Sequence, residues 1–344
     1  MPQEDYIDQD QIEQIEQIEQ DILQPVTIQV GPAIKDRRID KYLHGRFANY
    51  SRVMIQTIIK AGGVTVNGNK VKQSFQLTAG DKITLTLPEL PSKEIEPQDI
   101  PLNIIYEDND VLIINKQADL IVHPARSYKN GTLVNALAFY CDNLSSGLGE
   151  FRPGIVHRLD RNTTGVMIIT KNDVAQWKIA KQFQDRTTKK TYLTIVHGCP
   201  QLTADCINAP LGVHPREREK FAVRTESGKE AITFYEVLEE FKGYSLLKVR
   251  IKTGRTHQIR VHLAHIKHPV VADDMYGGKA VYLWQLQNAE PSAQPPLLDR
   301  VALHAYSIEF IHPTTGKPVL FEAPLPEDMQ NFLEMLRKYR KIEK

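Results

Sequence analysis

The sequence predicts an α+β protein with two folded domains, and three observations support this. Residues 26–88 combine short helices and strands with an excess of basic side chains. Residues 89–101 are rich in proline and acidic side chains, which is typical of an extended linker. From 102 to 341, strands and helices are interspersed without a regular βαβ rhythm, which favours a mixed architecture over a doubly wound parallel sheet.

The composition of the 344-residue chain is that of a globular protein, with 41% hydrophobic and 25% charged residues. No apolar run approaches the roughly 18 residues that span a bilayer. The acidic N-terminus contains no apolar signal core, so we expect a cytoplasmic protein without a membrane partner. The three cysteines show no CxxC spacing, which fits a reduced compartment and argues against a cysteine-built zinc site.

Residues 1–25 are expected to form an acidic low-complexity tail, with eight acidic residues and no lysine or arginine. The repeat "QIEQIEQIEQ" could form an amphipathic helix, but its strong negative charge and low complexity favour a mobile tail. Without the tail, 43 basic residues stand against 34 acidic ones, a net charge of +9.

Short elements follow one another in the basic segment. The second of its helices begins at a serine, Ser51, and ends at paired glycines, which are favourable caps. The dipeptide Asn67–Gly68 is typical of a two-residue hairpin turn. In chain order we expect a strand at 26–30, helices near 38–47 and 51–62, the hairpin, and a strand at 81–87.

Between residues 33 and 88, ten basic side chains stand against three acidic ones. Such an excess in a small module indicates a polyanionic partner, above all a nucleic acid. A basic surface that only contacts solvent is the alternative.

The larger domain is expected over residues 102–341. Its last helix has apolar residues at i, i+3, i+4 and i+7, which predicts one buried face. The sequences GxGxxG and GxxxxGK[ST] are both missing, so neither common nucleotide fingerprint is present. We expect strands at 111–116, 165–170, 191–196 and 244–251, and helices at 131–140, 172–184, 257–267 and 327–340.

The stretch "GIVHRLDRNTTGVMIIT" (154–170) places four ionisable residues directly before an apolar strand. Asp160 lies in the loop that leads into this strand, where Gly165 helps to shape the chain. A rigid sheet that holds a reactive loop residue is a common catalytic arrangement. A single carboxylate does not suffice for a two-carboxylate glycosidase or a magnesium cage, but it can act as a nucleophile or base beside a cation. A structural ion pair or a turn cap is the alternative.

The same stretch resembles the HRLDxxTSG signature of the RluA family of RNA pseudouridine synthases, with Thr164 in place of the usual serine. Four further blocks resemble that family in its order: "HPARSYKNGTLVNAL", "RPGIVHRLD", "KKTYLTIVHG" and "TGRTHQIRVHLAHIKHPVVADDMYG". In front of them, the pattern "RIDKYL…SR…GGVTVNG" resembles an S4 RNA-binding domain. The resemblance covers about residues 37–340 and is closest to the RluD-type branch.

The resemblance implies a fold and the roles of several residues. An S4-like domain would precede a catalytic domain with a mixed, mainly antiparallel β-sheet flanked by helices. Asp160 matches the family's essential aspartate, Tyr192 the tyrosine that stacks on the target base, and Arg260 the basic residue that pairs with the aspartate. Arg158 matches an arginine that enters the RNA stack where the uridine leaves it. Taken singly, Tyr192 could instead be a core residue and Arg260 a surface residue.

These roles fit the chemistry of the reaction. Uracil must be detached from C1′ of its ribose, turned over and rejoined through C5, so a carboxylate beside C1′ can capture the sugar or abstract one of its protons. A flipped base needs an aromatic surface to stack on, and another side chain must fill the gap that the base leaves in the RNA stack. We expect phosphate contacts from the basic module, at Arg37, Arg38, Lys41, Arg52, Lys60, Lys70 and Lys72.

No cofactor or metal is expected, because the isomerisation consumes no water, redox equivalent or phosphate. Four histidines lie close together in the sequence, but no HExxH motif accompanies them and no pair of carboxylates flanks them. We therefore predict no metal site at His257, His262, His265 or His268.

The sequence thus predicts an isomerase that converts specific uridines in structured RNA to pseudouridine, with large-subunit ribosomal RNA or its precursor as the partner. A catalytically idle RNA-binding or ribosome-assembly factor on the same fold is the main alternative, and a glycosidase acting on RNA is another. A monomer is expected. The sequence does not identify the uridine or the covalent route.

Overall fold

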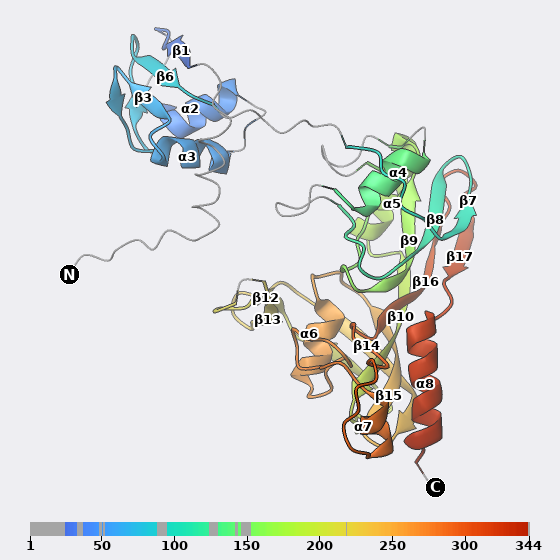
Figure 1. Ribbon diagram of the computed structural model, residues 1–344. Coiled ribbons are helices and arrows are strands. Elements are labelled where there is room, and N and C mark those ends of the chain that lie inside the picture. Colours follow the sequence, from blue (N-terminus) through green and yellow to red (C-terminus); the bar gives the residue numbers. More distant parts are fainter. Residues whose placement is uncertain are drawn as a thin grey trace, which may run out of the picture. The chain divides into compact units, whose positions relative to one another are not determined.

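The computed structural model divides the chain into two compact units, residues 1–93 and 94–344 (Figure 1). The structure describes residues 25–32, 37–47, 50, 52–87, 95–123, 130–141, 144–145, 153–217 and 219–342. The acidic tail therefore lies outside the described residues except for Pro25, and so does Ser51, the expected N-cap.

The first unit contains a four-stranded sheet with the order β1-β6-β3-β4. One face is apolar, because the isoleucine and leucine of "KITL" in β6 are buried while the lysine is exposed. Beside this sheet lie two helices and a two-stranded pair, β2–β5. The elements are β1 (Val26–Gln29), β2 (Arg37–Arg38), α2 (Ile39–Arg46), α3 (Arg52–Lys60), β3 (Val64–Val66), β4 (Asn69–Lys70), β5 (Gln76–Leu77) and β6 (Lys82–Leu85).

The expected hairpin at Asn67–Gly68 is confirmed. Both residues have positive φ, 51° and 80°, and they join β3 to β4 with Val66 opposite Asn69. This is the conformation that a tight two-residue hairpin requires, and asparagine and glycine adopt it most readily. Gly62, with φ of 83°, likewise allows the chain to leave α3.

The second unit is built on a nine-stranded sheet with the order β11-β14-β15-β10-β16-β9-β8-β7, in which β17 also pairs with β16. Every pair is antiparallel except β9–β16. The strands are β7 (Ile104–Glu107), β8 (Val111–Lys116), β9 (Thr164–Thr170), β10 (Lys189–His197), β11 (Ala204–Asn208), β14 (Ile232–Phe241), β15 (Tyr244–Ile251), β16 (Leu303–Ile311) and β17 (Pro318–Glu322), with a separate hairpin of β12 (Leu211–Val213) and β13 (Phe221–Val223). The expected mixed, mainly antiparallel α+β fold is confirmed.

Gly165 is essential for the one parallel pairing. It lies opposite Ala305, and a Cβ at this position would come within 2.2 Å of the Ala305 carbonyl oxygen. Its φ of 116° is also strained for any residue with a side chain. Only glycine therefore lets β9 approach β16 this closely, and this pairing fixes the loop that precedes β9.

The four helices expected in this unit are confirmed, with slightly shorter bounds at some ends. The side chain of Asn172 caps one of them by accepting a hydrogen bond from the Ala175 amide at 2.9 Å. The apolar stripe predicted for the last helix is buried, with Phe332 and Leu336 at 0% exposure. These four helices are α4 (Leu133–Tyr140), α5 (Asp173–Gln184), α6 (Gln258–His265) and α8 (Glu327–Tyr339), and a fifth, α7 (Leu283–Gln287), was not expected.

Residues 95–101 belong to the second unit, although they fall within the expected linker. Ile95 and Ile100 pack against its core, and the backbone amide of Gln98 donates to the Asn135 carbonyl at 3.0 Å. None of the helices in the described part of the chain has the length and apolar character that crossing a bilayer needs.

Candidate active site

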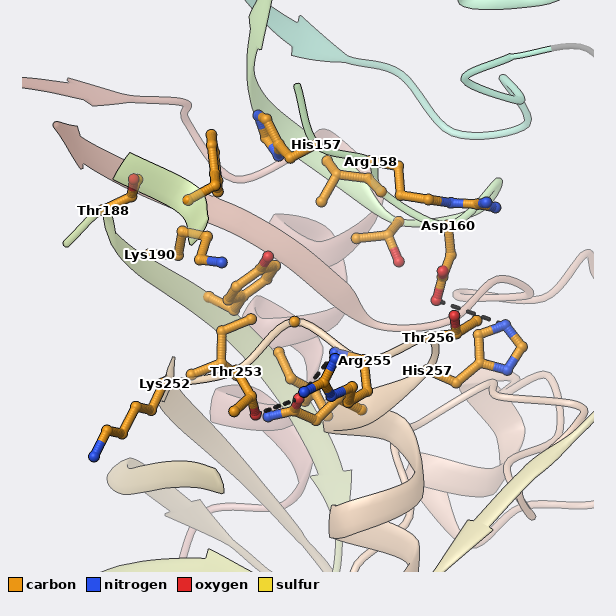
Figure 2. Close-up of a pocket in the computed structure, with 18 of the residues that line it drawn as sticks. His157, Arg158, Asp160, Thr188, Lys190, Lys252, Thr253, Arg255, Thr256 and His257 are labelled. Carbon is orange, nitrogen blue, oxygen red and sulfur yellow. Dashed lines mark hydrogen bonds and ion pairs between the residues drawn. The ribbon is translucent and has the colours of Figure 1, made fainter. Parts of the chain in front are cut away.

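A cavity of about 480 Å³ brings together the three residues that the resemblance implied to be catalytic (Figure 2). Asp160 comes from the loop before β9, Tyr192 from β10, and Arg260 from α6. The residues lie up to a hundred positions apart in the sequence, and all three line the same cavity.

The Asp160 carboxylate lies at an accessible position, with 23% of its side chain exposed. Its loop is anchored by Leu159, which is buried, and by a turn in which the Thr163 amide donates to the Asp160 carbonyl at 3.1 Å. Arg260 Nη1 donates to Asp160 Oδ2 at 3.3 Å, and His257 Nε2 lies 3.9 Å from the same oxygen. One carboxylate oxygen of Asp160, Oδ2, thus lies beside two nitrogen groups at the edge of the cavity.

Arg260 is fixed by a second carboxylate that the sequence did not reveal. Its Nε and Nη2 each donate to Asp273 at 2.7 Å, in a bidentate pair with a carboxylate that is 0% exposed. Its guanidinium also lies over the Tyr276 ring, 5.1 Å from the centroid. Burial alone would lower the pKa of Arg260, but the hydrogen bonds and charge of Asp273, together with Asp160, raise it above its usual value.

Tyr192 lines the cavity and is 8% exposed. A register shift in the β10–β16 pairing occurs between Thr191 and Tyr192, which is the kind of irregularity that redirects a side chain. Burial and, secondarily, the charge of Asp160 raise the pKa of Tyr192, so the phenol stays protonated at neutral pH. A neutral aromatic ring that lines this cavity can contact a flipped base.

Two further cavity residues, His157 and Lys190, were not given a role from the sequence. His157 Nε2 accepts a hydrogen bond from the Ile168 amide at 3.0 Å, and its ring stacks on Phe183 at 4.8 Å. Burial, with a smaller effect of Lys190, lowers the pKa of His157 to about 3, so the ring is a neutral structural element. The Lys190 ammonium points into the cavity and lies 5.3 Å from the Phe183 centroid.

Lys116 stabilises the loop that contains Asp160. Its side chain is 0% exposed, and its Nζ donates to the backbone carbonyls of Gln117, Leu120 and Arg161 at 2.8–2.9 Å. Burial lowers its pKa to about 7, although the charge of Asp160 acts in the opposite direction. A lysine at the end of the apolar run "VLIINK" was the only sequence signal for this support.

We expect Lys116→Met to loosen this loop and reduce stability. Methionine has similar length but leaves three carbonyls without their donor, and a buried unsatisfied group costs about 1–3 kcal/mol. Urea unfolding measures the free energy of unfolding, and single-turnover assays measure the rate of product formation. Exposed Lys317, replaced in the same way, is the matched control. Equal stability and rate for both variants would contradict a supporting role for Lys116.

The basic residues expected to contact RNA differ in their surroundings. Arg158 is exposed at the edge of the cavity. In the first unit, Lys41, Lys60, Lys70 and Lys72 are exposed, whereas the side chain of Arg37 lies outside the described residues.

Arg38 and Arg52 bind the buried carboxylate of Asp40 at 3.1 and 2.8 Å. Burial raises the pKa of Asp40, but the hydrogen bonds from these arginines and from Gln56 outweigh it and lower the pKa well below its usual range. The two arginines are therefore positioned by Asp40 and only partly free for phosphate.

The four neighbouring histidines do not gather into a ligand set within the described residues. Both ring nitrogens of His262 lie 2.9 Å from protein oxygens, Thr233 Oγ1 and the Ala209 carbonyl. His268 Nδ1 lies 2.9 Å from the His197 carbonyl. These contacts give two of the histidines structural roles.

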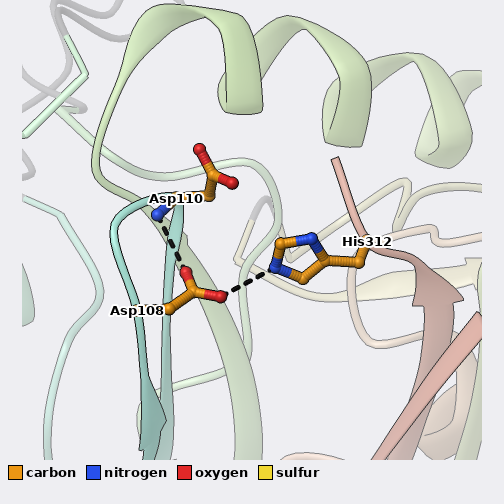
Figure 3. A group of neighbouring side chains, drawn as sticks. All are labelled: Asp108, Asp110 and His312. Carbon is orange, nitrogen blue, oxygen red and sulfur yellow. Dashed lines mark hydrogen bonds and ion pairs between the residues drawn. The ribbon is translucent and has the colours of Figure 1, made fainter. Parts of the chain in front are cut away.

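One group of potential ligands, Asp108, Asp110 and His312, does lie close together (Figure 3). His312 Nδ1 accepts hydrogen bonds from the amides of Thr314 and Thr315, so its Nε2 has the proton and donates to Asp108 Oδ2 at 2.8 Å. Asp108 Oδ1 accepts from two backbone amides, each at 2.8 Å. The group is thus a hydrogen-bonded link between the β7–β8 and β16–β17 turns.

Comparisons with known proteins agree with this geometry. Residues 110–265 match the family model described as RNA pseudouridylate synthase, and residues 37–83 match the S4 domain. An uncharacterized RNA pseudouridine synthase of Bacillus subtilis, YlyB, is 40% identical over 88% of this chain and 95% of its own length. A ribosomal large subunit pseudouridine synthase D of Xanthomonas campestris is 40% identical over 88% of this chain and 89% of its own.

A solved structure shows the same fold at low sequence identity. Human RNA pseudouridylate synthase domain containing 4 is 22% identical, with a TM-score of 0.54 over 70% of this chain and 95% of the human chain. Given the identity to relatives over nearly their whole length, this chain belongs to the RNA pseudouridine synthase family, with an S4 domain in front of the catalytic domain.

Proposed function

We propose that this protein converts specific uridines of large-subunit ribosomal RNA to pseudouridine, with Asp160, Tyr192 and Arg260 as its catalytic residues. The observation that supports these roles most directly is that Asp160, Tyr192 and Arg260 line one cavity, in which Arg260 donates to Asp160. The names of relatives such as the large subunit synthase D of Xanthomonas campestris support the choice of RNA. We further propose that the protein acts as a cytoplasmic monomer.

In this mechanism the target nucleotide leaves its stack and its base enters the cavity. The bond between C1′ and N1 breaks, the base turns, a C1′–C5 bond forms, and a proton moves from C5 to solvent while N1 gains one. The Asp160 carboxylate captures the sugar or takes a sugar proton, and either role needs its charged form. Tyr192 contacts the flipped base, and Arg260 orients the carboxylate by donating a hydrogen bond to its Oδ2.

Direct detection of pseudouridine tests this function. Purified protein is incubated with large-subunit ribosomal RNA that lacks the modification, and pseudouridine is located by carbodiimide treatment and mass spectrometry. The proposal expects conversion at one or a few uridines. Tight RNA binding without conversion would instead support the ribosome-assembly alternative, and release of free uracil would support a glycosidase.

The exposed lysines of the S4 domain should contribute affinity more than chemistry. We expect the double variant Lys70→Gln and Lys72→Gln to weaken binding of ribosomal RNA, because fewer counterions are released from phosphates. The slope of log K against log salt should fall by roughly 0.7–0.9 for each lysine that contacts a phosphate. Filter binding at several salt concentrations measures the slope, and Lys317→Gln in the second unit is the control. An unchanged slope would remove these lysines from the interface.

The reaction should need no metal ion, as its chemistry uses none. We expect full activity after EDTA treatment on a short stem-loop substrate that folds in monovalent salt, so that RNA folding does not depend on magnesium. A single-turnover assay with and without the chelator gives the result. Loss of activity that returns with added divalent ion would contradict the prediction.

A further inference from the structure

His257 occupies an unusual position beside Asp160. Its backbone is left-handed, with φ of 55°, at the N-cap position directly before α6. Non-glycine residues seldom adopt this conformation, and such residues cluster at functional sites. The ring is held edge-on between Phe221, at 5.8 Å, and Tyr276, at 5.6 Å. Backbone and ring are both fixed, so the direction of each ring nitrogen is defined.

The hydrogen bonds around Tyr276 favour one tautomer of the His257 ring. The Phe221 amide donates to the Tyr276 hydroxyl oxygen at 2.9 Å. His257 Nδ1 lies 2.8 Å from the same hydroxyl. Because the hydroxyl oxygen already accepts from the Phe221 amide, we assign Nδ1 as the acceptor of the hydroxyl hydrogen. Burial lowers the pKa of His257, and the opposing effect of Asp160 is smaller, so the ring is neutral at neutral pH. A neutral ring with an accepting Nδ1 has its hydrogen on Nε2.

This Nε2–H faces the candidate catalytic carboxylate, as Figure 2 shows. His257 Nε2 lies 3.9 Å from Asp160 Oδ2, and Arg260 Nη1 lies 3.3 Å from the same oxygen. Among the described residues, no hydrogen bond or ion pair engages Asp160 Oδ1. Two donors thus converge on one oxygen and leave the other for the substrate.

We propose that His257 is a positioning residue for Asp160. Its Nε2–H donates to Oδ2 once the target nucleotide fills the cavity, and this contact turns Oδ1 toward the ribose. Tyr276 and the β13 backbone hold the imidazole in the tautomer that can donate. The inference rests on the proposed catalytic role of Asp160.

Two substitutions separate the contributions of the two ring nitrogens of His257. In His257→Asn the side-chain amide overlays Nδ1, so it keeps the contact with Tyr276 and loses the donor to Asp160. In His257→Gln the amide reaches the place of Nε2, so a donor to Asp160 remains and the contact with Tyr276 is lost. Asparagine also tolerates the left-handed backbone, so His257→Asn should fold.

We expect His257→Asn to slow single-turnover conversion about 10- to 100-fold, the worth of one hydrogen bond to a charged group, with unchanged KM for RNA. His257→Gln should keep most of the parental rate. A loss in His257→Gln equal to or greater than that in His257→Asn would overturn the donor role, and so would parental rates in both. Asp160→Asn, assayed alongside, separates the failures: if it remains active, the role of Asp160 itself is wrong.

The tautomer can also be observed without activity or altered folding. In protein labelled with ¹⁵N-histidine, the imidazole signal of His257 is identified as the one that is absent from the spectrum of His257→Asn. In the parental protein this signal should show a protonated Nε2 and an unprotonated Nδ1. A protonated Nδ1 on that imidazole would contradict the inference, whatever the kinetics.

Discussion

Asp160→Asn should abolish pseudouridine formation while leaving RNA binding nearly unchanged. The amide has the size of the carboxylate, and the loop that holds it is anchored by Leu159 and by the Thr163 amide, neither of which contacts the replaced atoms. What disappears is the negative charge next to Arg260, 3.3 Å from its Nη1. The variant therefore separates chemistry from fold.

The expected loss of rate is large because no other carboxylate of the cavity can take the place of Asp160. Among the described residues that line the cavity, Asp160 is the only one with a carboxyl group. A positioned acid or base is commonly worth about 10²–10⁴-fold in rate, and loss of the group that we propose to capture the sugar or its proton should exceed this. RNA affinity should change little, because phosphate contacts dominate it.

Single-turnover conversion, followed by mass spectrometry, measures the rate of pseudouridine formation. Filter binding to the same RNA measures the affinity. Asp205→Asn is a matched control, since Asp205 is exposed on β11 and does not line the cavity. Conversion by Asp160→Asn at a near-parental rate would make Asp160 a structural turn residue, and the proposed mechanism would be wrong at its centre.

The sequence predicted the local elements well because their causes are local. The helices at 131–140 and 172–184 have side-chain caps and apolar spacing within their own residues, and the structure contains them as α4 and α5. The hairpin at Asn67–Gly68 likewise depends on two residues that tolerate positive φ. The motif around Asp160 was evident for a similar reason, since its four ionisable residues lie within five positions of the sequence.

Features that depend on distant contacts were not predicted. β16 was not among the expected strands, although its parallel pairing with β9 positions the Asp160 loop through Gly165 and Ala305. The support of that loop by Lys116 depends on the Arg161 carbonyl, 45 positions away. In each case the partner is selected by the fold, and a single sequence without periodic spacing contains no signal for it.

Asp273 illustrates this best, and its replacement gives the second large expected effect. Its carboxylate is fully buried and accepts two hydrogen bonds from Arg260, each of 2.7 Å. In Asp273→Asn the amide oxygen can accept from the guanidinium, but the amide NH₂ faces a second donor. Removing one partner of a buried ion pair costs about 3–5 kcal/mol, and the remaining contact with Asp160 should reduce this loss.

The expected effect on the rate follows from the positive charge that Arg260 keeps in this variant. Arg260 would keep its positive charge and have one carboxylate near it, Asp160, so its guanidinium should move toward that group and occupy the space of the ribose. A displacement of about 1 Å in a catalytic site can cost about 100-fold in rate. We expect Asp273→Asn to lower the single-turnover rate by about this factor, with a smaller change in RNA affinity.

Asp274→Asn provides a control at the adjacent position, because Asp274 is exposed and only the buried neighbour contacts Arg260. Urea unfolding and single-turnover rates are compared below the melting temperature of each variant, so that the rate refers to folded protein. Asp273→Glu keeps the charge with a longer side chain and should recover part of the rate. If Asp273→Asn lost stability but converted uridine at the parental rate, Asp273 would stabilise the fold only, and the orientation of Arg260 would depend on Asp160 and Tyr276 alone.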